Sequence, residues 1–279
     1  MKKIFSLCFL ACTFLNASLL DDKIKNIVGE KEYIFHKNLI DSFISDSSLY
    51  YMGDKINYNS VLKMLSENGL LKLKYNQPQN INIIFEISSN PLKSVKIIKD
   101  TLSSMGYSYY FTKSLTQKVE RYNETNNVKV LWTINLKSEY MIDPFVFNEE
   151  LNVVGGATRD IVKLDDTTWK YTIDTNNANL LNSKKIILGE KLKLTKPLNP
   201  YVFRVDNNAT NLKVFSRRLN NWHPRISFYD KDLNSISSEK KERKYKGISV
   251  SIPLSTYYIK IDDRYTLTNI RRGLTVLVE

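Results

Sequence analysis

The last third of the chain is a succession of short β-strand patterns, and this restricts its fold more than any other feature. The strand patterns are Ile186–Leu194, Tyr201–Val205, Leu212–Phe215, Arg225–Tyr229, Ile248–Ile252, Tyr257–Ile261 and Leu274–Val278. Turns rich in Asp, Asn, Ser and Pro separate them. Many short strands at this spacing are typical of two packed antiparallel sheets. We therefore predict an antiparallel β-sandwich for residues 178–279.

Residues 70–177 carry the order strand, helix, strand twice in succession. In the first copy, a strand with alternating apolar residues precedes a helix that begins at Asn90-Pro91, and alternating aromatic residues follow it. In the second copy, the helix begins at Asp143-Pro144 and two strands follow it. This order predicts a split βαβ, or ferredoxin-like, domain.

Residues 19–69 have apolar side chains at helical spacing, so this segment is predicted to be helical. Asn59 is expected to cap its last helix, and Asn68-Gly69 to end it. The predicted fold class is therefore α+β, with N-terminal helices, a ferredoxin-like split βαβ domain and a C-terminal antiparallel β-sandwich.

Residues 1–18 have the layout of a secretory signal peptide. Two lysines precede an apolar run of twelve residues at 4–15, and small residues follow, with cleavage expected near Ala17 or Ser18. The run is shorter than the roughly 20 apolar residues of a membrane-spanning helix, and no later stretch reaches that length. The sequence therefore predicts a periplasmic or secreted protein with no transmembrane segment in the mature chain.

Both cysteines, Cys8 and Cys12, lie inside this predicted signal peptide. If the signal is removed, the mature chain has no thiol nucleophile, disulfide or sulfur ligand. The alternative is a lipoprotein signal at Phe9-Leu10-Ala11-Cys12, in which Phe stands where Leu is usual.

Positive charge is concentrated in the last third of the chain. The formal net charge is +12, and residues 178–279 contribute 20 basic and 9 acidic side chains, a net of +11. This asymmetry suggests a boundary near 178 and an anionic partner for the C-terminal part. The alternative is a basic, solvated surface without a specific partner.

The candidate anion-binding or partner-binding residues follow this charge. They are Arg217, Arg218, Trp222, Arg225, Lys240, Lys241, Arg243, Lys244, Lys246, Arg271 and Arg272. Arginine and lysine suit phosphate and carboxylate groups, and Trp222 and Tyr245 are candidates to stack on a sugar ring or a base. Because the chain is predicted to be exported, the expected partners are envelope proteins or an anionic cell-wall or membrane surface, and a nucleic acid is disfavoured.

Catalytic, metal and cofactor sites are not expected. His36 and His223 are the only histidines and belong to different predicted domains, so neither a His/Cys zinc site nor a catalytic triad is supported. Adjacent carboxylates at Asp262-Asp263 are explained by turn chemistry. Alternating oxygen ligands at residues 230–234 leave calcium as a minor alternative.

Asp206-Asn207-Asn208-Ala209-Thr210 resembles the acceptor sequence of bacterial N-linked glycosylation, which has an acidic residue two positions before Asn-x-Ser/Thr. It lies between two predicted strands, where a loop is exposed. Asn208 is therefore a candidate modification site, with an Asn-rich turn as the alternative.

Three segments resemble two known families. The segment Ile226-Ser227-Phe228-Tyr229-Asp230-Lys231-Asp232-Leu233 and the segment Thr256-Tyr257-Tyr258-Ile259-Lys260-Ile261 resemble the bacterial pre-peptidase C-terminal (PPC-type) β-sandwiches, with Ser255 in place of the usual Gly. This resemblance implies an accessory binding or assembly module without catalytic residues. The segment from Ser66-Glu67-Asn68-Gly69-Leu70 to Met105-Gly106-Tyr107 resembles the small modules of secretins, which implies packing against neighbours in an envelope machine.

Together these features predict a non-catalytic scaffold or partner-binding component of a cell-envelope assembly, such as a secretion, pilus or flagellar apparatus. A carbohydrate- or cell-wall-polymer-binding module is the alternative, carried by Trp222, Tyr229, Tyr257 and the arginines. A hydrolase that uses carboxylates alone is a third possibility.

Overall fold

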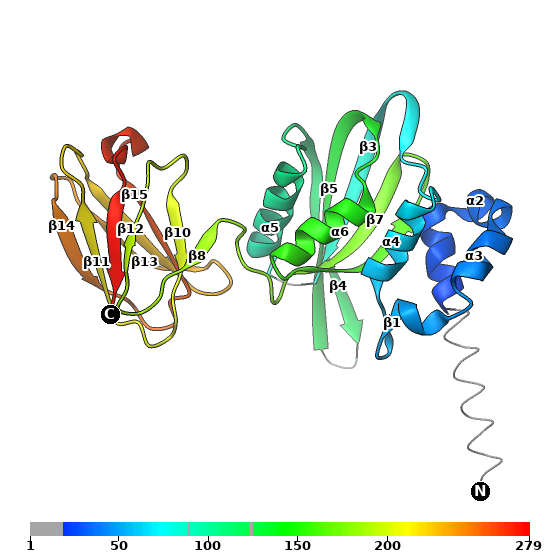
Figure 1. The fold of residues 1–279 in the computed structure, drawn as a ribbon, viewed down its shortest axis with the longest axis horizontal. Coiled ribbons are helices and arrows are strands. Elements are labelled where there is room, and N and C mark those ends of the chain that lie inside the picture. Colours follow the sequence, from blue (N-terminus) through cyan, green and yellow to red (C-terminus); the bar gives the residue numbers. More distant parts are fainter. Residues whose placement is uncertain (1–18, 89, 123–124) are drawn as a thin grey trace, which may run out of the picture. The chain divides into compact units, whose positions relative to one another are not determined.

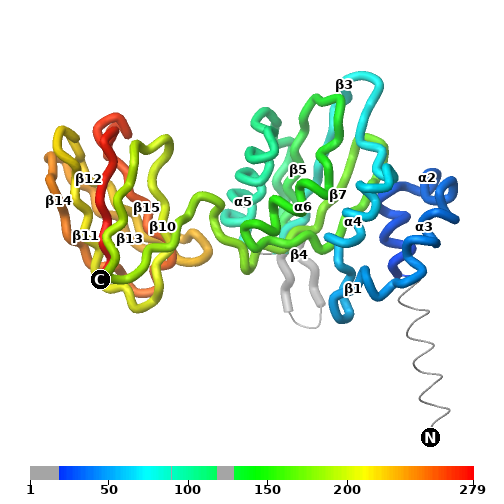
Figure 2. Tube along the Cα trace, viewed as in Figure 1, coloured from blue at the N-terminus to red at the C-terminus, as the bar shows by residue number. Residues whose placement is uncertain are grey.

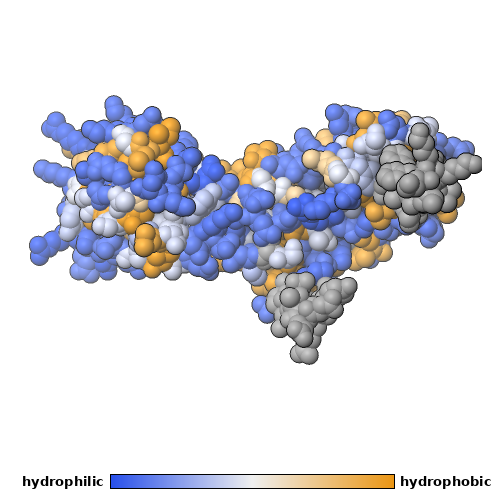
Figure 3. Space-filling model, turned by 90° about the horizontal axis from the view of Figure 1, so that it is seen from below, coloured by the Kyte–Doolittle hydropathy of each residue, from blue (hydrophilic) through white to orange (hydrophobic). Residues whose placement is uncertain are grey.

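The computed structural model of the protein describes residues 19–88, 90–122 and 125–279, with side chains outside 118–128. The predicted signal peptide lies outside the described residues. The described chain forms two compact units, one that ends at Asn179 and one from Leu180 to Glu279 (Figure 1). None of the helices in the described residues is long and apolar enough to cross a membrane. On the face drawn in Figure 3, hydrophilic residues cover most of both units, and apolar residues lie in separate groups.

The N-terminal segment is mostly helical, as predicted, with one small hairpin. Its elements are a helix at residues 19–28, α2 (Glu30–Phe35), α3 (Lys37–Phe43), the 3₁₀ helix η1 (Ser47–Tyr50), β1 (Tyr51–Met52), β2 (Lys55–Ile56) and α4 (Tyr58–Glu67). Asn57 caps α4, because its side-chain oxygen accepts a hydrogen bond from the backbone N–H of Ser60. The prediction of Asn59 as the cap was wrong. Asn59 instead accepts hydrogen bonds from the side chains of Asn148 (2.5 Å) and Asn152 (3.1 Å).

A mixed five-stranded sheet follows. Its chain order is β3 (Lys74–Ile87), α5 (Pro91–Ser104), β4 (Phe111–Tyr122), β5 (Thr125–Tyr140), α6 (Pro144–Val153), β6 (Ala157–Lys163) and β7 (Thr168–Asp174). The strand order is β4-β5-β3-β7-β6, and only β3 and β7 run parallel. The ferredoxin-like plan has four strands. Here β6 and β7 form a hairpin after α6, and β7 inserts beside β3 as a fifth strand. The α+β class is confirmed.

Helix caps and alternation explain why these residues form these elements. Asn90 and Asp143 cap α5 and α6 by accepting backbone hydrogen bonds, each followed by proline at the first helical position, as predicted. Alternate residues of β3 are buried, and α5 and α6 lie on one face of the sheet (Figure 2). The core of this unit therefore lies between those helices and the sheet.

Asp160 of β6 attaches the N-terminal helices to the sheet. Its carboxylate accepts hydrogen bonds from the ammonium group of Lys23 (2.8 Å) and the hydroxyl of Tyr58 (2.6 Å). The helical segment and the sheet are therefore parts of the same compact unit.

The second unit contains two sheets. Its elements are β8 (Ser183–Lys185), β9 (Lys191–Lys193), β10 (Tyr201–Arg204), β11 (Asn211–Ser216), β12 (Pro224–Tyr229), β13 (Ser235–Lys240), β14 (Gly247–Ser251), β15 (Tyr258–Asp263), the 3₁₀ helix η2 (Leu267–Ile270) and β16 (Leu274–Val278). One sheet has the order β13-β12-β15-β10-β8, and the other β14-β11-β16-β9. All neighbouring strands run antiparallel except β8 and β10.

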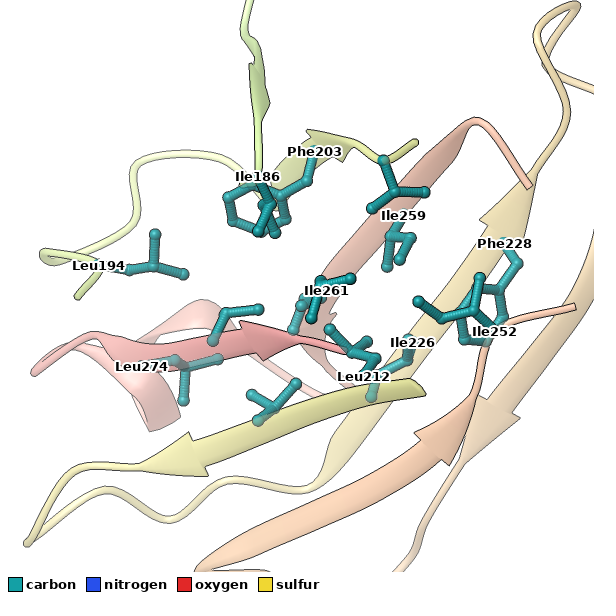
Figure 4. Close-up of a cluster of buried hydrophobic side chains, with 14 of the residues drawn as sticks. Ile186, Leu194, Phe203, Leu212, Ile226, Phe228, Ile252, Ile259, Ile261 and Leu274 are labelled. Atoms are coloured by element: carbon teal, nitrogen blue, oxygen red, sulfur yellow. The ribbon is translucent and has the colours of Figure 1, made fainter. Parts of the chain in front are cut away.

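Side chains of both sheets share one apolar core. Phe203, Ile226 and Ile261 of the first sheet and Leu212 and Leu274 of the second belong to the same buried cluster (Figure 4). Core residues alternate with partly exposed neighbours along β11, whereas on β15 the polar Asp262 is buried next to Ile261.

Candidate functional site

Four connections between the two sheets lie at the same end of the C-terminal unit. They are residues 194–200, 217–223, 241–246 and 264–273, and we call this set of loops the basic end. In Figure 1 this is the end that carries the 3₁₀ turn η2, away from the C-terminus. Strand direction alone places them together, because β9, β11, β13 and β15 all finish at this end.

Hydrogen bonds join these loops to one another. The side chain of Asn220 donates to the carbonyl of Gly273 (2.8 Å) and accepts from the N–H of Arg272 (3.2 Å). The N–H of Tyr245 donates to the carbonyl of Trp222 (2.9 Å), and the N–H of Leu194 donates to the carbonyl of Leu274 (2.8 Å), the first residue of β16 directly after the loop 264–273. The loops therefore form one connected surface.

The buried carboxylate of Asp263 holds three segments of this surface. Its Oδ2 accepts from the N–H of His223 (2.7 Å). Its Oδ1 accepts from the N–H groups of Tyr265 (2.9 Å) and Thr266 (3.0 Å) and from the side chain of Asn269 (2.9 Å). Burial raises the pKa of Asp263, but these hydrogen bonds outweigh it, so the pKa lies below its ordinary value.

The neighbouring carboxylate, Asp262, behaves in the opposite way. Burial raises the pKa of Asp262, and the cations of Lys260 (3.5 Å) and Arg225 (3.8 Å) lower it only in part. The net pKa therefore lies above the ordinary value. Asp262 and Asp263 are structural groups with different roles, which the sequence interpretation as a turn did not distinguish.

The basic end brings together most of the predicted cations. Its loops carry ten basic side chains and one acidic side chain, Glu242, which forms an ion pair with Arg264 at 3.1 Å. The predicted residues among them are Arg217, Arg218, Lys241, Arg243, Lys244, Lys246, Arg271 and Arg272. All of these except Lys241 are exposed, and Lys241 is half-buried. Such a concentration of one sign of charge attracts anions over distances near the Debye length, about 8–10 Å in ordinary buffers.

Three predicted residues do not belong to the exposed cations of these loops. Trp222 is fully buried, and its indole N–H donates to the carbonyl of Asp262 (3.0 Å), so its predicted role as a stacking surface was wrong. It is a core residue because its ring fills the space between the sheets. Arg225 lies on β12 facing Asp262, and Lys240 is the exposed last residue of β13 rather than a loop residue.

Sequence reasoning missed several residues of the basic end. Lys196 and Arg264 add two cations. Leu198, Leu219 and Tyr265 present exposed apolar side chains. The turn composition around Lys196-Pro197-Leu198 marks a loop, but only the strand order reveals that it adjoins the arginine-rich loops.

The opposite end of the same unit is acidic. Its segments are 186–190, 205–210, 230–234, 252–257 and Glu279, and they carry five acidic side chains and one basic side chain. The candidate calcium ligand Asp230 lies here, and its carboxylate accepts from the backbone N–H groups of Asp232 and Asn234 (both 2.8 Å). This is the geometry of a turn cap. The C-terminal unit therefore has opposite charges at its two ends.

The described residues contain no group of three His, Cys, Asp or Glu side chains arranged to hold a metal ion. His36 and His223 lie in different units. His223 contacts Asp263 at 3.6 Å and packs edge-on against Tyr265.

Asn208 is exposed in a turn after β10, at the acidic end. In the same sequence motif, the hydroxyl of Thr210 donates to the carbonyl of Glu279 (3.1 Å).

We expect native protein to be heavier than its processed chain by a glycan-sized increment, measured by intact mass spectrometry. Asn208→Gln should remove the increment, and Asn207→Gln, in the same turn, should retain it. Native protein at the mass of the unmodified chain would contradict modification at this site.

No protein-family model and no curated protein matches this chain. Its functional interpretation therefore depends on the geometry and charge described above.

Proposed function

We propose that the protein is a non-catalytic, exported component of a cell-envelope assembly, and that the basic end of its C-terminal unit binds an anionic partner. The observation that carries this proposal is the convergence of ten cations from four loops on one hydrogen-bonded surface. Loops held by a rigid scaffold are common sites of binding. On this proposal the two-sheet unit is a PPC-type β-sandwich, and the ferredoxin-like unit packs against protein neighbours in a secretion, pilus or flagellar apparatus.

A carbohydrate-binding role has less support. Trp222 is buried, and Tyr229 and Tyr257 are half-buried, so these aromatic residues do not offer exposed faces for stacking on sugar rings. Cation-mediated binding through the basic end remains the better interpretation.

The test compares two variants with equal loss of charge. One is the triple variant Arg218→Gln, Arg243→Gln and Arg271→Gln, at the basic end. The other is Lys184→Gln, Lys191→Gln and Lys231→Gln, exposed residues elsewhere in the same unit. Heparin, a polyanion, serves as the probe, and its dissociation constant is measured between low and moderate salt.

For the basic-end variant, the slope of log affinity against log salt should become shallower by about 2–3, because fewer counterions are released on binding. The control triple should retain the slope of the unaltered protein. Equal slopes in the two variants would show that net charge alone, and not this surface, governs anion binding.

A further inference from the structure

Apolar side chains project from the basic end among its cations. Leu198 has 88% of its surface exposed, Leu219 67% and Tyr265 62%. They come from three different loops, 194–200, 217–223 and 264–273. Single exposed leucines are common on protein surfaces, so their exposure alone carries little meaning. Their position beside cations is the informative part.

Leu219 also adopts an unfavourable backbone conformation. Its φ is +70°, in the left-handed region that branched and bulky residues rarely occupy. Glycine or asparagine would fit that conformation better. The chain therefore retains an exposed leucine where both local conformation and hydration disfavour it, which is a pattern found at functional positions.

The acidic end provides an internal comparison. Leu188 and Leu254 are exposed there as well, at 43% and 91%. The segments at the acidic end carry five acidic side chains and one basic side chain, and the loop of Leu254 carries no charge, whereas the loops of Leu198 and Leu219 carry Lys196, Arg217 and Arg218. Exposed apolar side chains therefore lie within a predominantly cationic set of loops at one end of this unit.

We propose that the partner of the basic end is the surface of an anionic phospholipid bilayer, with Leu198 and Leu219 entering the headgroup region. This inference rests on the proposed anion-binding function of the same surface. The cations bind lipid phosphates. The leucine side chains are transferred from water to the boundary between the headgroups and the acyl chains. Stable attachment of a peripheral protein to a membrane generally needs two such contributions.

The chemistry of this surface fits a bilayer better than other anionic partners. A charged polysaccharide offers anions but no apolar layer for the leucines. A folded acidic protein would need a complementary apolar pocket for each leucine. A bilayer accepts separate apolar tips at any spacing, and it is negatively charged when it contains anionic lipid.

The experiment measures binding of the purified protein to vesicles by co-sedimentation. One set contains about 30% phosphatidylglycerol in phosphatidylcholine, and the other contains phosphatidylcholine alone. The test variant is Leu198→Asn with Leu219→Asn. Asparagine suits the positive φ at 219, so loss of folding is not expected. The matched control is Leu188→Asn with Leu254→Asn, at the acidic end.

We expect the protein to bind the anionic vesicles and not the neutral ones. The Leu198/Leu219 variant should bind at least about tenfold more weakly, because two apolar side chains no longer leave water. The control pair should bind like the unaltered protein. The arginine triple variant should bind about 100-fold more weakly, at about fivefold for each lost cation.

Heparin affinity, measured in parallel, separates this inference from the function on which it rests. Loss of vesicle binding with unchanged heparin affinity in the Leu198/Leu219 variant would support the bilayer proposal. Heparin binding without any vesicle binding, or vesicle binding that ignores both leucines, would overturn it while the anion-binding function stands. If the arginine triple variant bound heparin as tightly as the unaltered protein, both the bilayer proposal and the anion-binding function would be overturned.

Discussion

Replacing Gly273 by alanine is expected to destabilise the C-terminal unit by about 3–5 kcal/mol, through the left-handed backbone and steric overlap together. Gly273 lies between η2 and β16 with a φ of +81°, and a Cβ there would overlap the carbonyl oxygen of Leu194. The two loops that meet at this contact both belong to the basic end. The measurement is hydrogen exchange of amides in β11 and β16, followed by mass spectrometry, which reports opening of this unit separately from the other.

Gly189→Ala is the matched control. Gly189 has nearly the same φ, +80°, but no atom lies within 4 Å of the position of a Cβ. Gly189→Ala should lower the stability of the unit by only about 1–2 kcal/mol, because alanine is disfavoured in the left-handed conformation. Equal losses of stability from the two substitutions would show that the close approach of residues 273 and 194 does not exclude a side chain at position 273.

Asp263→Asn should lower the stability of the same unit by about 2–4 kcal/mol near neutral pH. The carboxylate accepts four hydrogen bonds, and hydrogen bonds to charged groups contribute about 1.5–3 kcal/mol each before competing costs. An amide in its place would direct N–H donors toward other N–H donors. Exchange of the β15 and β16 amides would measure the loss.

The pH dependence gives this prediction a sign. The pKa of Asp263 is lower in the folded protein than its ordinary value, because the hydrogen bonds outweigh burial. Its contribution is therefore fully present above the unfolded-state pKa of about 3.9 and is lost as pH falls through the folded-state value. The difference in unfolding free energy between the unaltered protein and Asp263→Asn should be constant from pH 6 to 8, because these pH values lie about two units or more above the unfolded-state pKa. The difference should shrink in acid.

Asp262→Asn is the control for Asp263. Burial raises the pKa of Asp262 in the folded protein, so its charge opposes folding above that pKa. Removing the charge should leave stability unchanged or increase it slightly at neutral pH. A large loss from Asp262→Asn would contradict the different roles assigned to these neighbours.

Local signals in the sequence predicted local structure well. Asn90-Pro91 and Asp143-Pro144 mark the starts of α5 and α6 because capping depends on residues within one turn. The prediction of Asn59 as the cap of α4 failed because Asn59 has a partner that is distant in the sequence. Asn59 is occupied by Asn148 and Asn152 of α6, and no local pattern reveals that contact.

Strand pairing and burial were harder to predict from the sequence, because they also depend on distant partners. The alternation in β7 is the same whether it pairs beside β3 or at an edge, so the parallel pair was not predicted. Trp222 follows two arginines and two asparagines, which suggested exposure, yet its ring lies in the core. Four loops, each separated from the next by 16 or 17 residues, form the basic end only through the order of the strands.

The opposite charges at the two ends of the C-terminal unit have a kinetic consequence. A body with such a charge separation turns in the field of a negatively charged surface before it touches that surface, so productive encounters become more frequent. Added salt should then slow arrival far more than departure, because screening acts on the approach. The dissociation rate should depend mainly on the short-range contacts that the exposed side chains of the basic end have made.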